Sequence, residues 1–99
     1  MSAILLLALG LLGCDDIATR CGPLDRMETP VSAADMAVLD AVAAAISADN
    51  AGRPDIWLID ADEATGTVTV GLMDRTAVIC DGFHARYGPY VDLLGPPDQ

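Results

Sequence analysis

A thiol and an imidazole stand one helical turn apart near the end of the sequence. Three residues separate Cys80 from His84, a spacing that brings both side chains to one face of a helix. Such a pair could supply two ligands of a metal ion, or a nucleophile and its base. Zinc needs three or four ligands, and a catalytic Cys-His pair needs an orienting carboxylate and an oxyanion site; neither set is complete here. We therefore expect His84, the single histidine, to be a partly exposed helix residue.

The acidic run Asp60-Ala61-Asp62-Glu63, followed by Gly66, invites comparison with a calcium-binding loop. An EF-hand loop requires acids at its first, third and fifth positions, glycine at the sixth and glutamate at the twelfth. Counted from Asp60, the fifth position is Ala64, Gly66 falls at the seventh and the twelfth is Gly71. We interpret the run as an acidic hairpin turn, and we predict neither a metal site nor a cofactor.

The aromatic residues are candidates for a contact surface. The chain has four, Trp57, Phe83, Tyr87 and Tyr90. We expect Trp57 to open a strand and the other three to follow the apolar side of a helix, so that all four share the core. The alternative is that Tyr87 and Tyr90, on either side of Gly88-Pro89, form an exposed ledge for a protein or peptidoglycan partner, because exposed aromatics are frequent interface anchors.

The most specific pattern lies before the first cysteine. An unbroken apolar run from Ala3 to Leu12 ends in Leu11-Leu12-Gly13-Cys14. This segment resembles the signal of bacterial lipoproteins, although Met1-Ser2 lacks the basic residue that such signals usually carry. The run is about half of the ~20 residues that span a bilayer, which disfavours a permanent transmembrane helix. The alternative is the first core helix of a cytosolic protein, but the run has no polar positions at helical spacing.

The resemblance implies where the protein works. Residues 1–13 would be removed, and Cys14 would carry a thioether-linked diacylglycerol that holds the chain on the bilayer, facing the periplasm. Two or three acyl chains make a durable anchor, whereas one is marginal. Asp15 and Asp16 directly follow Cys14 and resemble the signal that retains some lipoproteins in the inner membrane.

The charge of the chain bears on its possible partners, and its cysteine content bears on disulfide formation. The chain has five arginines, no lysine and fifteen acidic residues, for a net charge of −10. Binding to nucleic acid requires clustered basic residues, so we predict no nucleic-acid partner. Cys21 and Cys80 remain once Cys14 is lipidated, and in an oxidising periplasm we expect them to form a disulfide. The alternative is two separate buried thiols.

Four segments follow along the chain. Residues 14–31 are polar and contain Gly22-Pro23 and Pro30, which predicts an acidic tether after the signal peptide of residues 1–13. Residues 32–94 form the domain, and residues 95–99 are a Pro-rich tail.

Within the domain, Ser32 and Asp35 form a capping box for a helix that ends near Asp49. Apolar and β-branched residues predict strands at 56–59 and 67–73, joined by a hairpin loop. Asp74 is expected to cap a second helix, residues 75–86, with a short helical turn after Gly88-Pro89.

These elements predict an α+β fold: a small single domain with the order helix–strand–strand–helix, and both helices packed on an antiparallel β-hairpin. Because a two-stranded sheet is marginal, a third strand or a partner's edge could complete it. The functional hypothesis is a small non-enzymatic, membrane-anchored envelope lipoprotein that acts as an accessory or protein-interaction module, using the sheet edge or Tyr87 and Tyr90. The alternative is a small enzyme or metal-binding protein that uses Cys80 and His84.

Overall fold

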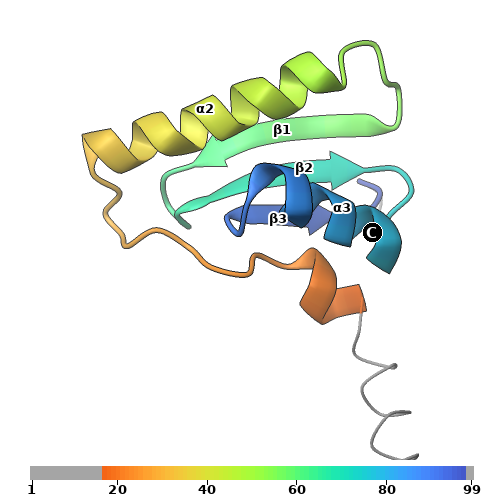
Figure 1. Ribbon diagram of the computed structural model, residues 1–99, viewed down its shortest axis with the longest axis horizontal. Helices are drawn as coiled ribbons and strands as arrows, with labels where there is room; N and C mark the ends of the chain where they lie inside the picture. The colour runs from red at the N-terminus through yellow and green to blue at the C-terminus, as the bar shows by residue number, and fades with distance from the viewer. Residues whose placement is uncertain (1–16, 98–99) are drawn as a thin grey trace, which may run out of the picture.

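The computed structural model describes residues 17–97, so the predicted signal peptide and Cys14 lie outside the described residues. A short helical segment, residues 17–21, begins the described chain. Five elements follow in the order α2 (Ala33–Asp49), β1 (Ile56–Asp62), β2 (Thr67–Leu72), α3 (Ala77–Tyr87) and β3 (Val91–Leu94) (Figure 1). The chain is a small α+β domain, as the sequence predicts, with one more strand at its end.

Local signals set the ends of α2. The Ser32 hydroxyl accepts a hydrogen bond of 3.1 Å from the Asp35 N–H, which satisfies one of the free donors of the first turn. At the other end, the Asn50 N–H donates to the Ile46 carbonyl at 3.1 Å. Leu39 and Ile46, two turns apart, are completely buried, so one side of α2 enters the core.

The second helix begins later than the sequence suggests. Thr76, not Asp74, is the N-cap of α3, and its hydroxyl accepts from the Ile79 N–H at 3.2 Å. Asp74 is exposed and precedes the cap by two residues. Both residue types make good N-caps, so composition alone did not decide between them.

The sheet has the order β1-β2-β3, with β1 and β2 antiparallel and β2 and β3 parallel. The prediction of a helical turn after Gly88-Pro89 is wrong, because Val91–Leu94 forms β3. Burial alternates along this segment: Val91 and Leu93 are buried, whereas Asp92 and Leu94 are more exposed. This two-residue period is typical of a strand. The third strand that stabilises the hairpin therefore comes from this chain itself.

One core lies between the helices and one face of the sheet. β2 is the central strand, and Val68, Val70 and Leu72 point into that core with at most 1% exposure. In Figure 1, α2 runs along β1, and α3 lies against β3. The two helices also contact each other, so both cover the same face.

Residues 22–31, called the strap below, do not hang free as a tether. The N–H groups of Leu24 and Asp25 donate to the Pro89 carbonyl at 2.9 and 3.0 Å, and the Met27 N–H donates to the Gly66 carbonyl at 2.9 Å. The strap therefore crosses the starts of β3 and β2 before it enters α2, and it is part of the domain (Figure 1).

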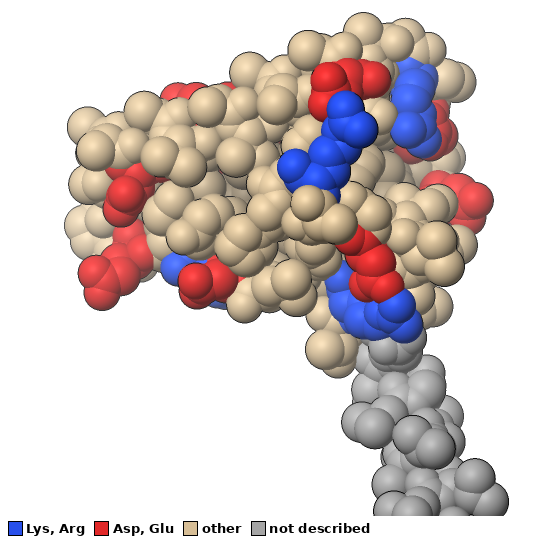
Figure 2. Space-filling view, in the orientation of Figure 1, with Lys and Arg blue, Asp and Glu red and all other residues tan. Residues whose placement is uncertain are grey.

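Charged side chains are distributed unevenly on the surface. Ion pairs join Arg20 to Asp81, Arg53 to Asp55 and Arg86 to Asp49. In Figure 2, basic side chains lie beside acidic ones, while further acidic side chains stand apart from any blue group. Exposed pairs of this kind add little stability. Their main consequence is that much of the positive charge is neutralised locally, which leaves the surface acidic.

Candidate binding site on the open face of the sheet

The predicted disulfide is present. Cys21 and Cys80 are joined with their Cα atoms 5.0 Å apart, and both residues are completely buried. The bond ties the helical segment 17–21 to α3, and the Arg20–Asp81 ion pair lies beside it. Cys80 therefore has no free thiol for metal binding or nucleophilic attack. Within residues 17–97, no three metal-binding side chains gather into a candidate site.

His84 is buried rather than partly exposed. Only 9% of it is exposed, and its Nε2 lies 2.8 Å from the Val91 carbonyl oxygen. Because a carbonyl only accepts, Nε2 must carry a proton and donate it. His84 thus fastens the end of α3 to β3, and it does not share a site with a reactive Cys80.

The free edge of β3 is covered by side chains. The Tyr90 carbonyl accepts from the Val68 N–H of β2, so the alternate carbonyls of Val91 and Leu93 point away from the sheet. His84 donates to the first of these carbonyls, and Arg75 Nη1 donates to the second at 3.1 Å. Capped edges of this kind resist pairing with another strand. We conclude that β3 is a poor acceptor for a partner strand, which leaves β1 as the other edge.

Tyr87 and Tyr90, the alternative contact surface in the sequence, are each partly buried in the structure. Tyr87 donates from its hydroxyl to Asp49 Oδ2 at 2.8 Å and meets Phe83 edge-on, with ring centroids 5.6 Å apart. Burial is the main cause that raises the Tyr87 pKa, and the hydrogen bond from Tyr87 lowers the pKa of Asp49. Tyr87 and Tyr90 are both half-buried against the core. Tyr87 thus links α3 to the end of α2.

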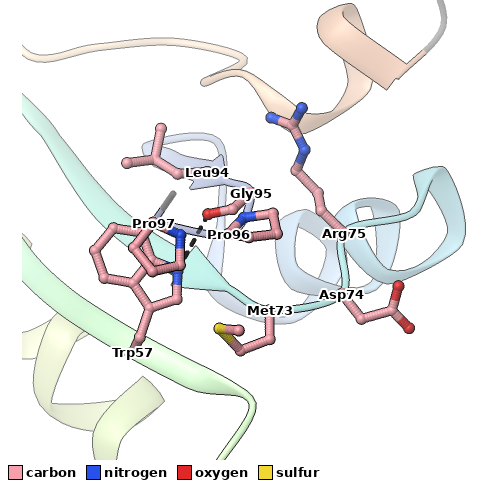
Figure 3. Close-up of a pocket in the computed structure, with 8 residues that line it drawn as sticks. All are labelled: Trp57, Met73, Asp74, Arg75, Leu94, Gly95, Pro96 and Pro97. Carbon is pink, nitrogen blue, oxygen red and sulfur yellow. Dashed lines mark hydrogen bonds between the residues drawn. The ribbon is translucent and has the colours of Figure 1, made fainter. Parts of the chain in front are cut away.

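Trp57 lies on the opposite face of the sheet from the helices. Gly71 stands between Val70 and Leu72, whose side chains enter the core, so a Cβ on Gly71 would point to the other face. That Cβ would lie only 2.4 Å from Trp57 Cε2, so the indole packs directly on the Gly71 backbone. The indole Nε1 donates to the Gly95 carbonyl at 3.1 Å (Figure 3), and 39% of Trp57 remains exposed.

An open hollow of about 650 Å³ surrounds this indole. Its lining residues come from the start of β1, the carboxyl ends of β2 and β3 and the residues that follow them: Trp57, Met73, Asp74, Arg75, Leu94, Gly95, Pro96 and Pro97. Figure 3 shows the indole, Met73, Leu94 and the two prolines around the hollow, while the Asp74 carboxylate points away from the indole. We call this feature the Trp57 hollow. Its lining combines apolar side chains with the polar groups of Asp74 and Arg75, and both kinds of group are common in binding sites.

The Trp57 hollow allows a direct test of the packing described above. Gly71→Ala should force the indole off the sheet and destabilise the domain by about 1–3 kcal/mol, as overpacking usually does. Because Trp57 is the only tryptophan, its fluorescence should shift to the red. Gly82→Ala is the control, since a Cβ there meets nothing within 4 Å and helix propensity favours alanine. An unchanged emission spectrum in Gly71→Ala would contradict the placement of the indole.

The sequence reasoning placed Trp57 in the shared core and so missed the hollow. The pairing of β1 with β2 has an irregularity between Ile56 and Leu58, and this bulge turns Trp57 to the outer face. One signal in the sequence could have found the site. Gly71 interrupts an otherwise well-formed strand, and a glycine there often marks a close approach by another group.

Comparison of the chain with family models, with curated proteins and with solved structures found no match. Among the helices of residues 17–97, none has the length and apolar character needed to cross a membrane.

Proposed function

We propose that this chain is a small non-enzymatic lipoprotein of the bacterial cell envelope, anchored through acylated Cys14 and facing the periplasm. The observation that carries the proposal is the buried Cys21–Cys80 disulfide. Structural disulfides are typical of proteins in oxidising compartments. The pair also leaves Cys14, in the sequence Leu11-Leu12-Gly13-Cys14, as the one remaining cysteine of the chain.

The short distance along the chain between Cys14 and the folded domain supports a domain held close to the membrane. Only Asp15 and Asp16 separate Cys14 from Ile17, where the helical segment 17–21 has begun. Three extended residues span about 10 Å, so a lipid on Cys14 would lie within that reach of Ile17. The disulfide then fixes this end of the chain to α3. A lipidated form would thus have almost no linker between lipid and domain.

Cys14→Ser tests the anchor. The wild-type chain, extracted with detergent, should lack residues 1–13 and carry added acyl mass, and it should fractionate with membranes. Cys14→Ser should lose the acyl mass and the membrane attachment. Cys21→Ser/Cys80→Ser is the matched cysteine control, because it keeps Cys14 and should remain on the membrane. A full-length, unmodified wild-type chain would rule the proposal out.

The two acidic residues after Cys14 allow a further arm of the same experiment. If they retain the protein in the inner membrane, Asp15→Ser/Asp16→Ser should move it to the outer-membrane fraction. An unchanged distribution between the two membranes would assign retention to another feature without affecting the lipid anchor itself.

The Trp57 hollow supports the second part of the proposal, a role as a protein-interaction module. It exposes an aromatic ring, Met73 and Leu94, and large exposed apolar groups that lie together commonly mark an interaction site. The alternative of an enzyme or metal-binding protein required a free thiol at Cys80 beside an accessible imidazole. No observation in the described residues favours it, since Cys80 is bonded to Cys21 and His84 donates to Val91.

A further inference from the structure

The outer face of the sheet carries two different rows of side chains. Gly71 of β2 pairs with Leu58 of β1 on one side and with Leu94 of β3 on the other. The Trp57 indole packs on Gly71. We call these residues the apolar row. One side of the row continues into the Trp57 hollow.

The neighbouring row on the same face is acidic. Asp60 pairs with Thr69, and Thr69 pairs with Asp92, so two carboxylates flank one threonine. Neighbouring strands are about 4.8 Å apart, which places the two carboxylates roughly 10 Å from each other. Residues two apart along a strand are about 7 Å apart, and this is the spacing between the acidic and apolar rows.

Asp92 is partly desolvated and already lies near positively charged side chains of this chain. Burial is the largest influence on Asp92 and raises its pKa, while the charges of Arg26, Arg75 and His84 act in the opposite direction. Arg75 already donates to the Leu93 carbonyl. Asp60, on the far side of Thr69, is exposed. A partner cation near Thr69 would therefore meet one solvated and one partly desolvated carboxylate, in a chain whose net charge is −10.

We propose that the outer face of the sheet binds an extended, basic segment of a partner protein, with one large apolar side chain in the Trp57 hollow and a lysine or arginine two residues away over the acidic row. The spacing of the rows matches residues i and i+2 of an extended chain, whose side chains share a face. Charge complementarity selects a basic partner rather than an acidic one and should speed the encounter. This inference extends the proposed interaction role, and it does not depend on lipidation of Cys14.

Synthetic peptides test the chemistry of the partner directly. The probe is a nine-residue peptide that alternates serine with lysine and has one central leucine, so that lysine and leucine stand two residues apart. One comparison peptide replaces lysine with glutamate, and another replaces the leucine with serine. Titration into the full chain, with its disulfide intact, is followed by Trp57 fluorescence and by backbone amide chemical shifts.

The expected result is saturable binding of the lysine–leucine peptide, with shifts centred on Trp57, Thr69 and Leu94. The glutamate peptide should not bind, and the peptide without leucine should bind at least tenfold more weakly. Binding should also weaken as sodium chloride rises from 50 to 500 mM, because exposed charges are then screened.

Two variants divide the surface into its parts. Asp60→Asn/Asp92→Asn should weaken peptide binding at least tenfold, and Leu94→Ser should do so while Trp57 remains as the reporter. Asp40→Asn/Glu28→Gln removes the same charge from exposed positions on α2 and the strap, and its affinity should stay within twofold of wild type. Thermal unfolding of each variant establishes that it is folded.

Several outcomes would overturn the proposal. These are no binding of the lysine–leucine peptide at millimolar concentration, equal binding of the glutamate peptide, shifts centred on α2 or α3, or equal weakening in the control variant. A chain that binds the peptide but fractionates away from membranes would retain this inference and lose the anchor. A chain that fractionates with membranes but does not bind the peptide would retain the anchor and lose this inference.

Discussion

Replacing both Cys21 and Cys80 with alanine is expected to lower the free energy of unfolding by about 4 kcal/mol. The bond closes a loop across a sequence separation of 59 residues, and most of its stabilisation comes from restricting the unfolded chain. A domain of this size is stable by roughly 5–10 kcal/mol in total, so the loss should take a large share of its stability. Urea denaturation, followed by Trp57 fluorescence, measures it.

A reducing agent provides the matched control for this experiment. Wild type treated with reductant should unfold at nearly the same urea concentration as Cys21→Ala/Cys80→Ala, which should itself be insensitive to the reductant. Cys14→Ala keeps the disulfide and should respond to reductant as wild type does. If oxidised wild type and the double variant unfolded together, the bond would contribute nothing, and the chain-entropy argument would be wrong here.

Gly66→Ala is expected to destabilise the domain by about 2–4 kcal/mol, for two reasons that add. Gly66 has a φ of 70°, and a side chain in that left-handed conformation costs about 1–2 kcal/mol. A Cβ there would also lie 2.4 Å from the Met27 carbonyl oxygen and 2.9 Å from the Met27 nitrogen. The strap would have to move, and the hydrogen bond from Met27 to Gly66 would be lost, at about 1 kcal/mol.

Gly52→Ala separates the two contributions. Gly52 has a φ of 81°, but a Cβ there meets nothing within 4 Å, so this variant measures the conformational cost alone. The excess loss in Gly66→Ala should appear as faster hydrogen exchange at the Met27 amide, because the strap is displaced. Equal destabilisation of the two variants would mean that the strap does not pack on Gly66.

The elements that the sequence predicts correctly are those with local signals. Ser32 and Asp35 define the start of α2, and the stretch from Asn50 to Pro54 defines its end. Alternating apolar residues in β2, and Gly66 in the turn before it, define the hairpin. The disulfide followed from counting cysteines and from the compartment that Cys14 suggested. The residues that determine each of these elements are close together in the sequence, and the disulfide involves only two cysteines.

The elements that the sequence misses depend on distant contacts. β3 has only four residues, and the spacing of Tyr87, Tyr90 and Leu94 fits a helix as well as a strand; pairing with β2 decides between them. The strap is rich in turn residues, and it is attached by backbone groups to carbonyls of Pro89 and Gly66, which no side-chain pattern reveals. The bulge beside Trp57 likewise leaves no mark in the residue types of β1. The candidate site was therefore the least predictable part.

The disulfide also determines how the domain would bear a pulling force. Tension applied at residue 17 and at the carboxyl end would pass from Cys21 across the sulfur bridge to Cys80, and then through α3 and β3. The strap, α2, β1 and β2 lie inside the covalent loop, so this tension cannot extend them even after the hydrogen bonds between β2 and β3 break. About 200 Å of chain is thereby withheld from extension, at roughly 3.4 Å for each residue. Mechanically, this domain is a short chain with most of its sequence held in a closed side loop.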